Sequence, residues 1–252
     1  MNHAGAMVAG AATTGLLAMV AAGPAVAQDI SISLGEDASL TARSLQLIAL
    51  ITVLSLAPGL AIMITCFPFI VTVLAILRQG IGLQQSPPNM LIVSLALFLT
   101  YFVMEPVFTT AWERGIDPLL QERIGVEAAL GEALVPFRSF MAGRVDPDTF
   151  AAMAALRPDD AAQGAGVAPV PDSPLSVLVP SFLLSEIARA FEVGFLIFLP
   201  FLIIDLVVAA VLMSMGMMMV PPAIVSLPFK LAFFVIADGW TLVAGSLVRG
   251  YF

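Results

Sequence analysis

The chain has 252 residues, of which 60% are hydrophobic and 11% charged, and its net charge at pH 7 is −8. Soluble domains are about half apolar and a quarter charged, so this composition indicates a membrane protein. The 10 Lys and Arg residues are scattered and form no basic patch, which argues against nucleic acid as a partner. With one His and one Cys, the chain has no His-based metal site, no His-containing catalytic triad and no intramolecular disulfide. We therefore expect no catalytic site, no metal and no cofactor.

The N-terminal segment predicts a cleaved signal peptide over residues 1–27. Residues 6–23 are weakly apolar and rich in Ala and Gly, and Ala25-Val26-Ala27 before Gln28 has the small-x-small pattern of a signal-peptidase site. No Lys or Arg precedes Arg43, so the usual basic start of a leader is missing. The alternative is an Ala-rich anchor helix that stays uncut. A polar segment, 28–43, follows the expected cleavage between Ala27 and Gln28.

Four long apolar stretches follow, at 45–77, 90–108, 191–220 and 223–248. A spanning helix needs about 20 apolar residues, so the first stretch is too long for one span. Pro58-Gly59 and Pro68 interrupt it, which predicts a kinked helix or two half-helices. We expect an all-α fold with two apolar helical hairpins. These are residues 44–108, turning at Pro87-Pro88, and residues 181–252, turning at Pro221-Pro222.

The segment 109–180 is more polar than its neighbours. Arg78 is the only charge between the first two apolar stretches, which places that turn inside and 109–180 in the extracytoplasmic space. Asp117-Pro118 and Asp146-Pro147 each combine an N-cap residue with a proline at the first helical position, so each predicts a helix start. Residues 157–174 are rich in Ala, Gly and Pro and predict a flexible loop.

Glu105, Asp205, Lys230 and Asp238 lie in apolar surroundings. Each costs about 2.5–3.5 kcal/mol on membrane-insertion scales, so each needs a reason to be there. Counted from the prolines at 1.5 Å per residue, both Asp lie about 24 Å deep and Lys230 about half as deep. On this count Lys230 is level with neither Asp of its own hairpin.

These charges allow three interpretations. They could line a proton or ion relay, form an aspartyl-protease pair, or pair structurally between packed helices within or between chains. The sequences around Asp205 and Asp238 lack the Gly-x-Gly-Asp pattern of such proteases. Structural pairing is the simplest of the three.

Five of the chain's 13 Met residues lie in the run 213–222, at positions Met213, Met215, Met217, Met218 and Met219. Methionine is flexible and polarizable, and it re-packs around changing partners. Core packing is the ordinary role of such a cluster. The adjacency of Met217, Met218 and Met219, however, points some side chains away from their own hairpin.

Several motifs resemble the FliP family of flagellar type III export proteins, which has relatives in virulence injectisomes. The similarity covers about residues 40–252, and the segments that carry it are 65–71 (TCFPFIV), 77–79, 87–89, 105–106, 136–141 (PFRSFM), 185–186, 194–208 (GFLIFLPFLIIDLVV), 213–222, 226–230 (SLPFK) and 238–240.

The resemblance implies a non-enzymatic, pore-forming core subunit of the export gate in the bacterial inner membrane, at the flagellar basal body. It implies a homo-oligomer of about five copies that rises helically into a ring. The implied partners are FliR-like and FliQ-like membrane subunits, FlhA/FlhB-like export components, membrane lipid and unfolded flagellar substrates. A cleaved signal peptide is also implied.

The same resemblance assigns roles to individual residues. It implies a pore gasket of Met213, Met215, Met217, Met218 and Met219. It implies charge pairing between subunits for Glu186, Asp205, Lys230 and Asp238. Two alternatives stay open: a proton-coupled small-solute transporter that uses Glu105, Asp205 and Asp238, and a passive scaffold whose pore is made by its partners.

Overall fold

The structure is a computed structural model that describes residues 40–82, 87–157 and 169–251. Within these ranges every regular element is a helix and no strand occurs, which confirms the all-α prediction. The chain forms two compact units, Met1–Val53 and Leu54–Phe252. The predicted signal peptide, its cleavage site at Ala27 and Gln28, and most of the predicted loop 157–174 lie outside the described residues.

The first long apolar stretch is divided into two helices, as predicted. Helix α2 (Leu40–Met63) ends before Ile64, and α3 (Phe67–Ile81) begins with Pro68 in its first turn. Proline is well suited to that position because its missing N–H would have no helical partner there. Pro58 and Gly59 lie within α2 and do not end it.

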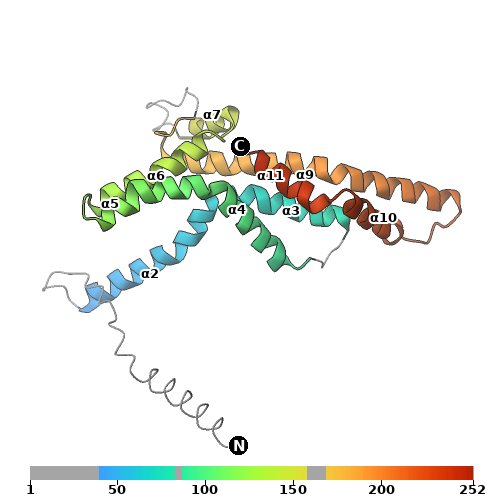
Figure 1. Ribbon diagram of the computed structural model, residues 1–252, viewed down its shortest axis with the longest axis horizontal. Helices are drawn as coiled ribbons and strands as arrows, with labels where there is room; N and C mark the ends of the chain where they lie inside the picture. Colours follow the sequence, from blue (N-terminus) through green and yellow to red (C-terminus); the bar gives the residue numbers. More distant parts are fainter. Residues whose placement is uncertain (1–39, 83–86, 158–168, 252) are drawn as a thin grey trace, which may run out of the picture. The chain divides into compact units, whose positions relative to one another are not determined.

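The core of the second unit forms around α3, which packs most extensively on α9 (Leu175–Ser214) and also on α4 (Asn89–Ala111) (Figure 1). The buried face of α3 has helical spacing and consists of Phe69, Ile70, Val73, Leu74, Leu77 and Ile81. Two glycines permit the close approach of α3 to α9. A Cβ on Gly194 would lie 2.4 Å from Ile76 Cδ1, and a Cβ on Gly80 would lie 3.1 Å from the rings of Phe198 and Phe201.

The segment after α4 differs from the sequence prediction at Asp117. Helix α4 continues through a π-helical turn, η1 (Trp112–Ile116), into the short α5 (Asp117–Leu120). Asp117 therefore lies within a continuing helical chain and caps no new helix. Glu122, at φ 55°, separates α5 from α6 (Val126–Ala142). Asp146 is the N-cap of α7 (Pro147–Ala155), as predicted, because its Oδ2 accepts a 2.8 Å hydrogen bond from Thr149 N–H.

The C-terminal part consists of the 40-residue α9, then α10 (Pro222–Ile236) and α11 (Gly239–Arg249). At 1.5 Å per residue α9 is about 60 Å long, twice the roughly 30 Å hydrocarbon thickness of a bilayer. By length and apolar composition, two helical stretches in the described ranges can cross a membrane, Asn89–Leu120 and Leu175–Ser214. A third is possible if α10 and α11, which meet at a 62° bend, count as one span.

Candidate functional site

The methionine run forms the tip between α9 and α10. Gly216 ends α9 in the left-handed conformation, at φ 76°. The Gly216 N–H donates to Met213 O over 3.1 Å and the Met217 N–H donates to Leu212 O over 2.9 Å, which is the hydrogen-bond pattern of a Schellman C-cap. Pro221 then caps α10, and Pro222 is its first residue. The glycine thus stops one helix and the prolines start the next.

The side chains of this methionine tip, residues 213–219, are exposed. The exposed fraction is 61% for Met213, 67% for Met215, 42% for Met217, 83% for Met218 and 98% for Met219. Core packing within one chain therefore does not account for these residues. They form a flexible, polarizable apolar surface at the end of the hairpin.

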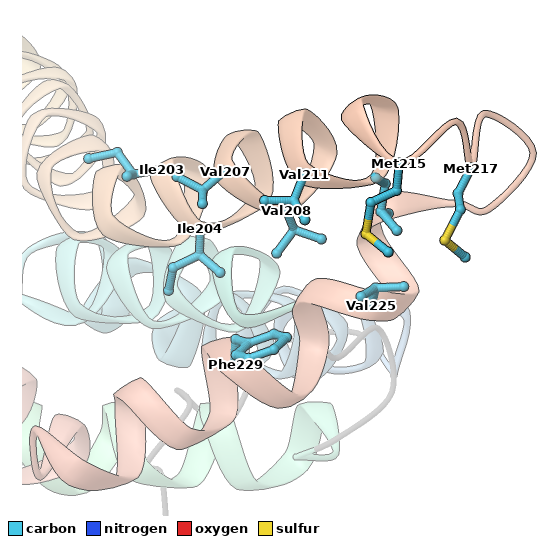
Figure 2. Close-up of a pocket in the computed structure, with 10 residues that line it drawn as sticks. Ile203, Ile204, Val207, Val208, Val211, Met215, Met217, Val225 and Phe229 are labelled. Carbon is cyan, nitrogen blue, oxygen red and sulfur yellow. The ribbon is translucent and has the colours of Figure 1, made fainter.

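A wholly apolar cavity of about 570 Å³ lies behind the tip, between the two arms of the hairpin. Figure 2 shows Ile204, Val208 and Met215 on the α9 side facing Val225 and Phe229 of α10. Met217 lies at the loop end of the cavity. The arms are therefore incompletely packed against each other next to the tip, which leaves the methionines room to change rotamer.

Lys230 joins three helices, α3, α9 and α10. Its Nζ donates to Asp205 Oδ2 on α9 over 2.6 Å and to Gly80 O of α3 over 3.1 Å. Ser226 Oγ donates to the other oxygen of Asp205, Oδ1, over 2.5 Å. Lys230 is buried, and its ammonium is compensated by a carboxylate and a carbonyl.

This contact corrects the depth count made from the sequence. Asp205 lies nine residues before the end of α9, and Lys230 lies eight residues after the start of α10, so the two are level. The count was wrong because it took the prolines as the apex, whereas residues 215–221 form a loop that adds no helical rise.

Glu186 on α9 is fully buried and is the centre of a second charged cluster. Its Oε1 lies 3.1 Å from Arg144 and 3.9 Å from Arg189, and its Oε2 accepts a hydrogen bond from the Tyr251 hydroxyl. Burial raises the pKa of the Tyr251 phenol, so the hydroxyl keeps the proton that it donates. Glu186, Asp205 and Lys230 thus each have partners within one chain, and pairing between subunits stays a prediction for them.

Asp238 and Glu105, the remaining acidic residues that the sequence singled out in apolar surroundings, are exposed. Asp238 has left-handed backbone angles, φ 48° and ψ 49°, and accepts a 3.1 Å hydrogen bond from the Thr241 hydroxyl. Glu105 lies on the exposed side of α4. In the described part of the chain no three His, Cys, Asp or Glu side chains lie close enough to hold a metal ion. Glu105, Asp205 and Asp238 therefore do not form a metal-binding group within one chain.

Sequence reasoning missed the partners Arg144, Tyr251, Ser226 and Gly80. Arg144 and Tyr251 are separated from Glu186 by 42 and 65 residues. Ser226 and Lys230 are one helical turn apart and so share a face, a signal that could have placed both on Asp205.

The chain is similar to known proteins over most of its length. The model of the FliP family matches residues 50–247. "Flagellar biosynthetic protein FliP" of Caulobacter vibrioides is 53% identical over 226 residues, which cover 88% of this chain and 82% of the relative. The protein of the same description from Agrobacterium fabrum is 48% identical over 218 residues, 85% of this chain and 86% of the relative. That from Bacillus subtilis is 41% identical over 222 residues, 88% of this chain and 98% of the relative.

Proposed function

Because this chain belongs to the FliP family, we propose that it is a core pore-forming subunit of the flagellar type III protein export gate. In this role it passes unfolded flagellar subunits across the bacterial inner membrane at the basal body. The relatives are flagellar biosynthetic proteins, which favours a flagellar over an injectisome assignment.

The exposed methionine tip is the observation that carries this proposal. A pore that passes many different unfolded chains needs a lining that adapts to any side chain and closes when empty. Unbranched thioethers supply both properties, because they change rotamer easily and have no fixed hydrogen-bonding demand. The cavity behind the tip supports this role, since Met215 and Met217 line it and can withdraw into it.

We propose that the tips of about five copies meet in a closed ring, together with FliR-like and FliQ-like subunits. The length of α9 supports this arrangement. A helix of about 60 Å cannot be covered by one bilayer, so its exposed apolar residues, among them Phe195, Leu206 and Val211, need neighbouring subunits as well as lipid. FlhA/FlhB-like components would deliver the substrates.

We propose that the chain is divided into five segments. They are a signal peptide (1–27), a polar segment (28–43), the first hairpin (44–108), the extracytoplasmic segment (109–180) and the second hairpin (181–252). The mass of the mature chain tests the first of these. Cleavage after Ala27 removes the first 27 residues, whereas a full-length mature chain would contradict it.

Replacing Met217, Met218 and Met219 together by Ala tests the gasket. We expect the complex to assemble and the membrane to leak ions, because three long side chains per copy are shortened at the constriction. The matched control is Met63→Ala with Met90→Ala, two exposed methionines far from the tip in sequence. Normal ion permeability in the tip variant would rule out the gasket and favour a passive scaffold.

Mass measurement of the intact complex, purified with its partners, tests the assembly. A monomer that moves protons on its own in lipid vesicles would instead support the transporter alternative.

A further inference from the structure

The C-terminal end of the chain is held by a residue far away in sequence. Arg144, after α6, donates from Nη1 to Gly250 O over 2.8 Å, and its guanidinium carbon lies 4.0 Å from the centre of the Tyr251 ring. The same guanidinium donates from Nε to Glu186 Oε1 over 3.1 Å. We call Arg144, Glu186 and Tyr251 the C-terminal clasp. It ties the end of α11 to α9 and to the extracytoplasmic segment.

The ring of Tyr251 covers part of the core. It packs edge-on against Phe69, with the ring centres 5.6 Å apart, and it stacks on Phe140 at 6.1 Å. Tyr251 also packs against the cluster of buried residues that contains Cys66, whose exposed fraction is 0%. Tyr251 is therefore one of the residues that separate this part of the core from solvent.

The other end of α11 is a strained bend. Asp238 is held in the left-handed region, where any residue with a Cβ is less stable than glycine. Gly239 follows, and a Cβ there would lie 2.2 Å from the Phe234 ring, so the two helices meet without space for a side chain. Strain of this kind persists only while surrounding contacts enforce it.

Release of the tail leaves no uncompensated buried charge. Glu186 has Arg144 at 3.1 Å and Arg189 at 3.9 Å beside it, and neither cation belongs to the tail. The charge of the buried carboxylate is therefore compensated with or without Tyr251, although Oε2 loses its hydrogen bond when the tail leaves. We propose that the C-terminal clasp is a latch that holds α11 bent at Asp238, and that its release lets α11 swing away and uncovers Cys66.

The chain's only cysteine reports on the latch directly. The full-length protein in detergent is treated with a water-soluble maleimide, and the labelling rate of Cys66 is measured. Tyr251→Phe removes the hydroxyl that donates to Glu186 and should raise the rate about tenfold, because a hydrogen bond to a charged acceptor is lost. Tyr101→Phe is the matched control. Tyr101 is the other tyrosine, is 62% exposed on α4, and should leave the rate unchanged.

A second variant tests the hinge in the opposite direction. Asp238→Gly relieves the left-handed strain and stabilises the bent state, so it should slow the labelling of Cys66. Unfolding exposes the thiol and speeds labelling, so slower labelling of a monodisperse variant with the wild-type circular-dichroism spectrum is not a result of unfolding. This variant therefore decides the matter if Tyr251→Phe proves to be unfolded by circular dichroism. Wild-type labelling rates in a folded Tyr251→Phe protein, or in Asp238→Gly, would overturn the latch.

Discussion

Lys230 donates a 2.6 Å hydrogen bond to Asp205, and the same ammonium reaches the carbonyl oxygen of Gly80. The chain's one lysine thereby fixes the two arms of the α9–α10 hairpin to each other and to α3. The hairpin carries the methionine tip at its free end. The position of the tip therefore depends on an ion pair more than two helical turns from the helix ends that carry it.

Replacing Lys230 by Met should destabilise the protein by about 2–3 kcal/mol, less than for a fully buried pair because Asp205 is 33% exposed. Most of this loss comes from leaving the Asp205 side chain without its cation. The midpoint of thermal unfolding in detergent measures the effect. The double variant with Asp205→Leu should recover most of it, and the exposed Arg123→Met serves as the control. A single variant as stable as wild type would show that the pair contributes nothing.

Gly216→Ala should destabilise the tip by about 1–2 kcal/mol, because a Cβ is disfavoured at φ 76° whatever space surrounds it. Gly216→Asn should cost less, since Asn tolerates left-handed angles. Both are measured by thermal unfolding, with ion permeability of the assembled complex as the functional readout. If Ala and Asn behave alike, the left-handed C-cap is not what ends α9.

Gly115→Ala should cost about 1–3 kcal/mol by overpacking the contact between η1 and α6. Its Cβ would lie 2.6 Å from the backbone oxygen of Ala129, and backbone cannot rotate away as a side chain does. Gly131→Ala in α6 is the matched control. It meets nothing within 4 Å and should be neutral or slightly stabilising, because Ala is the better helix former. Equal unfolding midpoints for the two variants would contradict the close packing.

Asp146 predicts a pH dependence of stability. The pKa of its carboxyl group is lowered from 3.8 because the Thr149 backbone N–H donates to the ionised form. A folded pKa below the unfolded value means that the cap stabilises α7 above about pH 4 and loses this effect as pH falls through the folded pKa. Asp146→Asn should lose less stability than wild type between pH 7 and pH 3, measured by thermal unfolding. Asp172→Asn, at another exposed Asp, should follow wild type.

Much of the local structure was predictable because it depends on nearby residues. Asp146 starts a helix where the sequence indicated, and the predicted interruption at Pro68 is the break before α3, since a capping carboxylate and a proline ring act within one turn. Asp117 failed as a start signal because the preceding helix does not stop: a π-helical turn carries the chain through it. A cap signal indicates a helix start only where the chain before it leaves the helix.

The sequence by itself determined the helical class, the apolar surfaces and the methionine cluster, because composition, spacing and proline positions are local properties. Only the tertiary structure decided which charges meet. Asp205 pairs with Lys230 because the seven loop residues 215–221 add no helical rise, so the two side chains lie level on α9 and α10. Glu186 contacts Arg144 and Tyr251, which are 42 and 65 residues away in the sequence. A buried ion pair forms wherever packing brings two charges within hydrogen-bonding distance, and that distance is set by the whole fold.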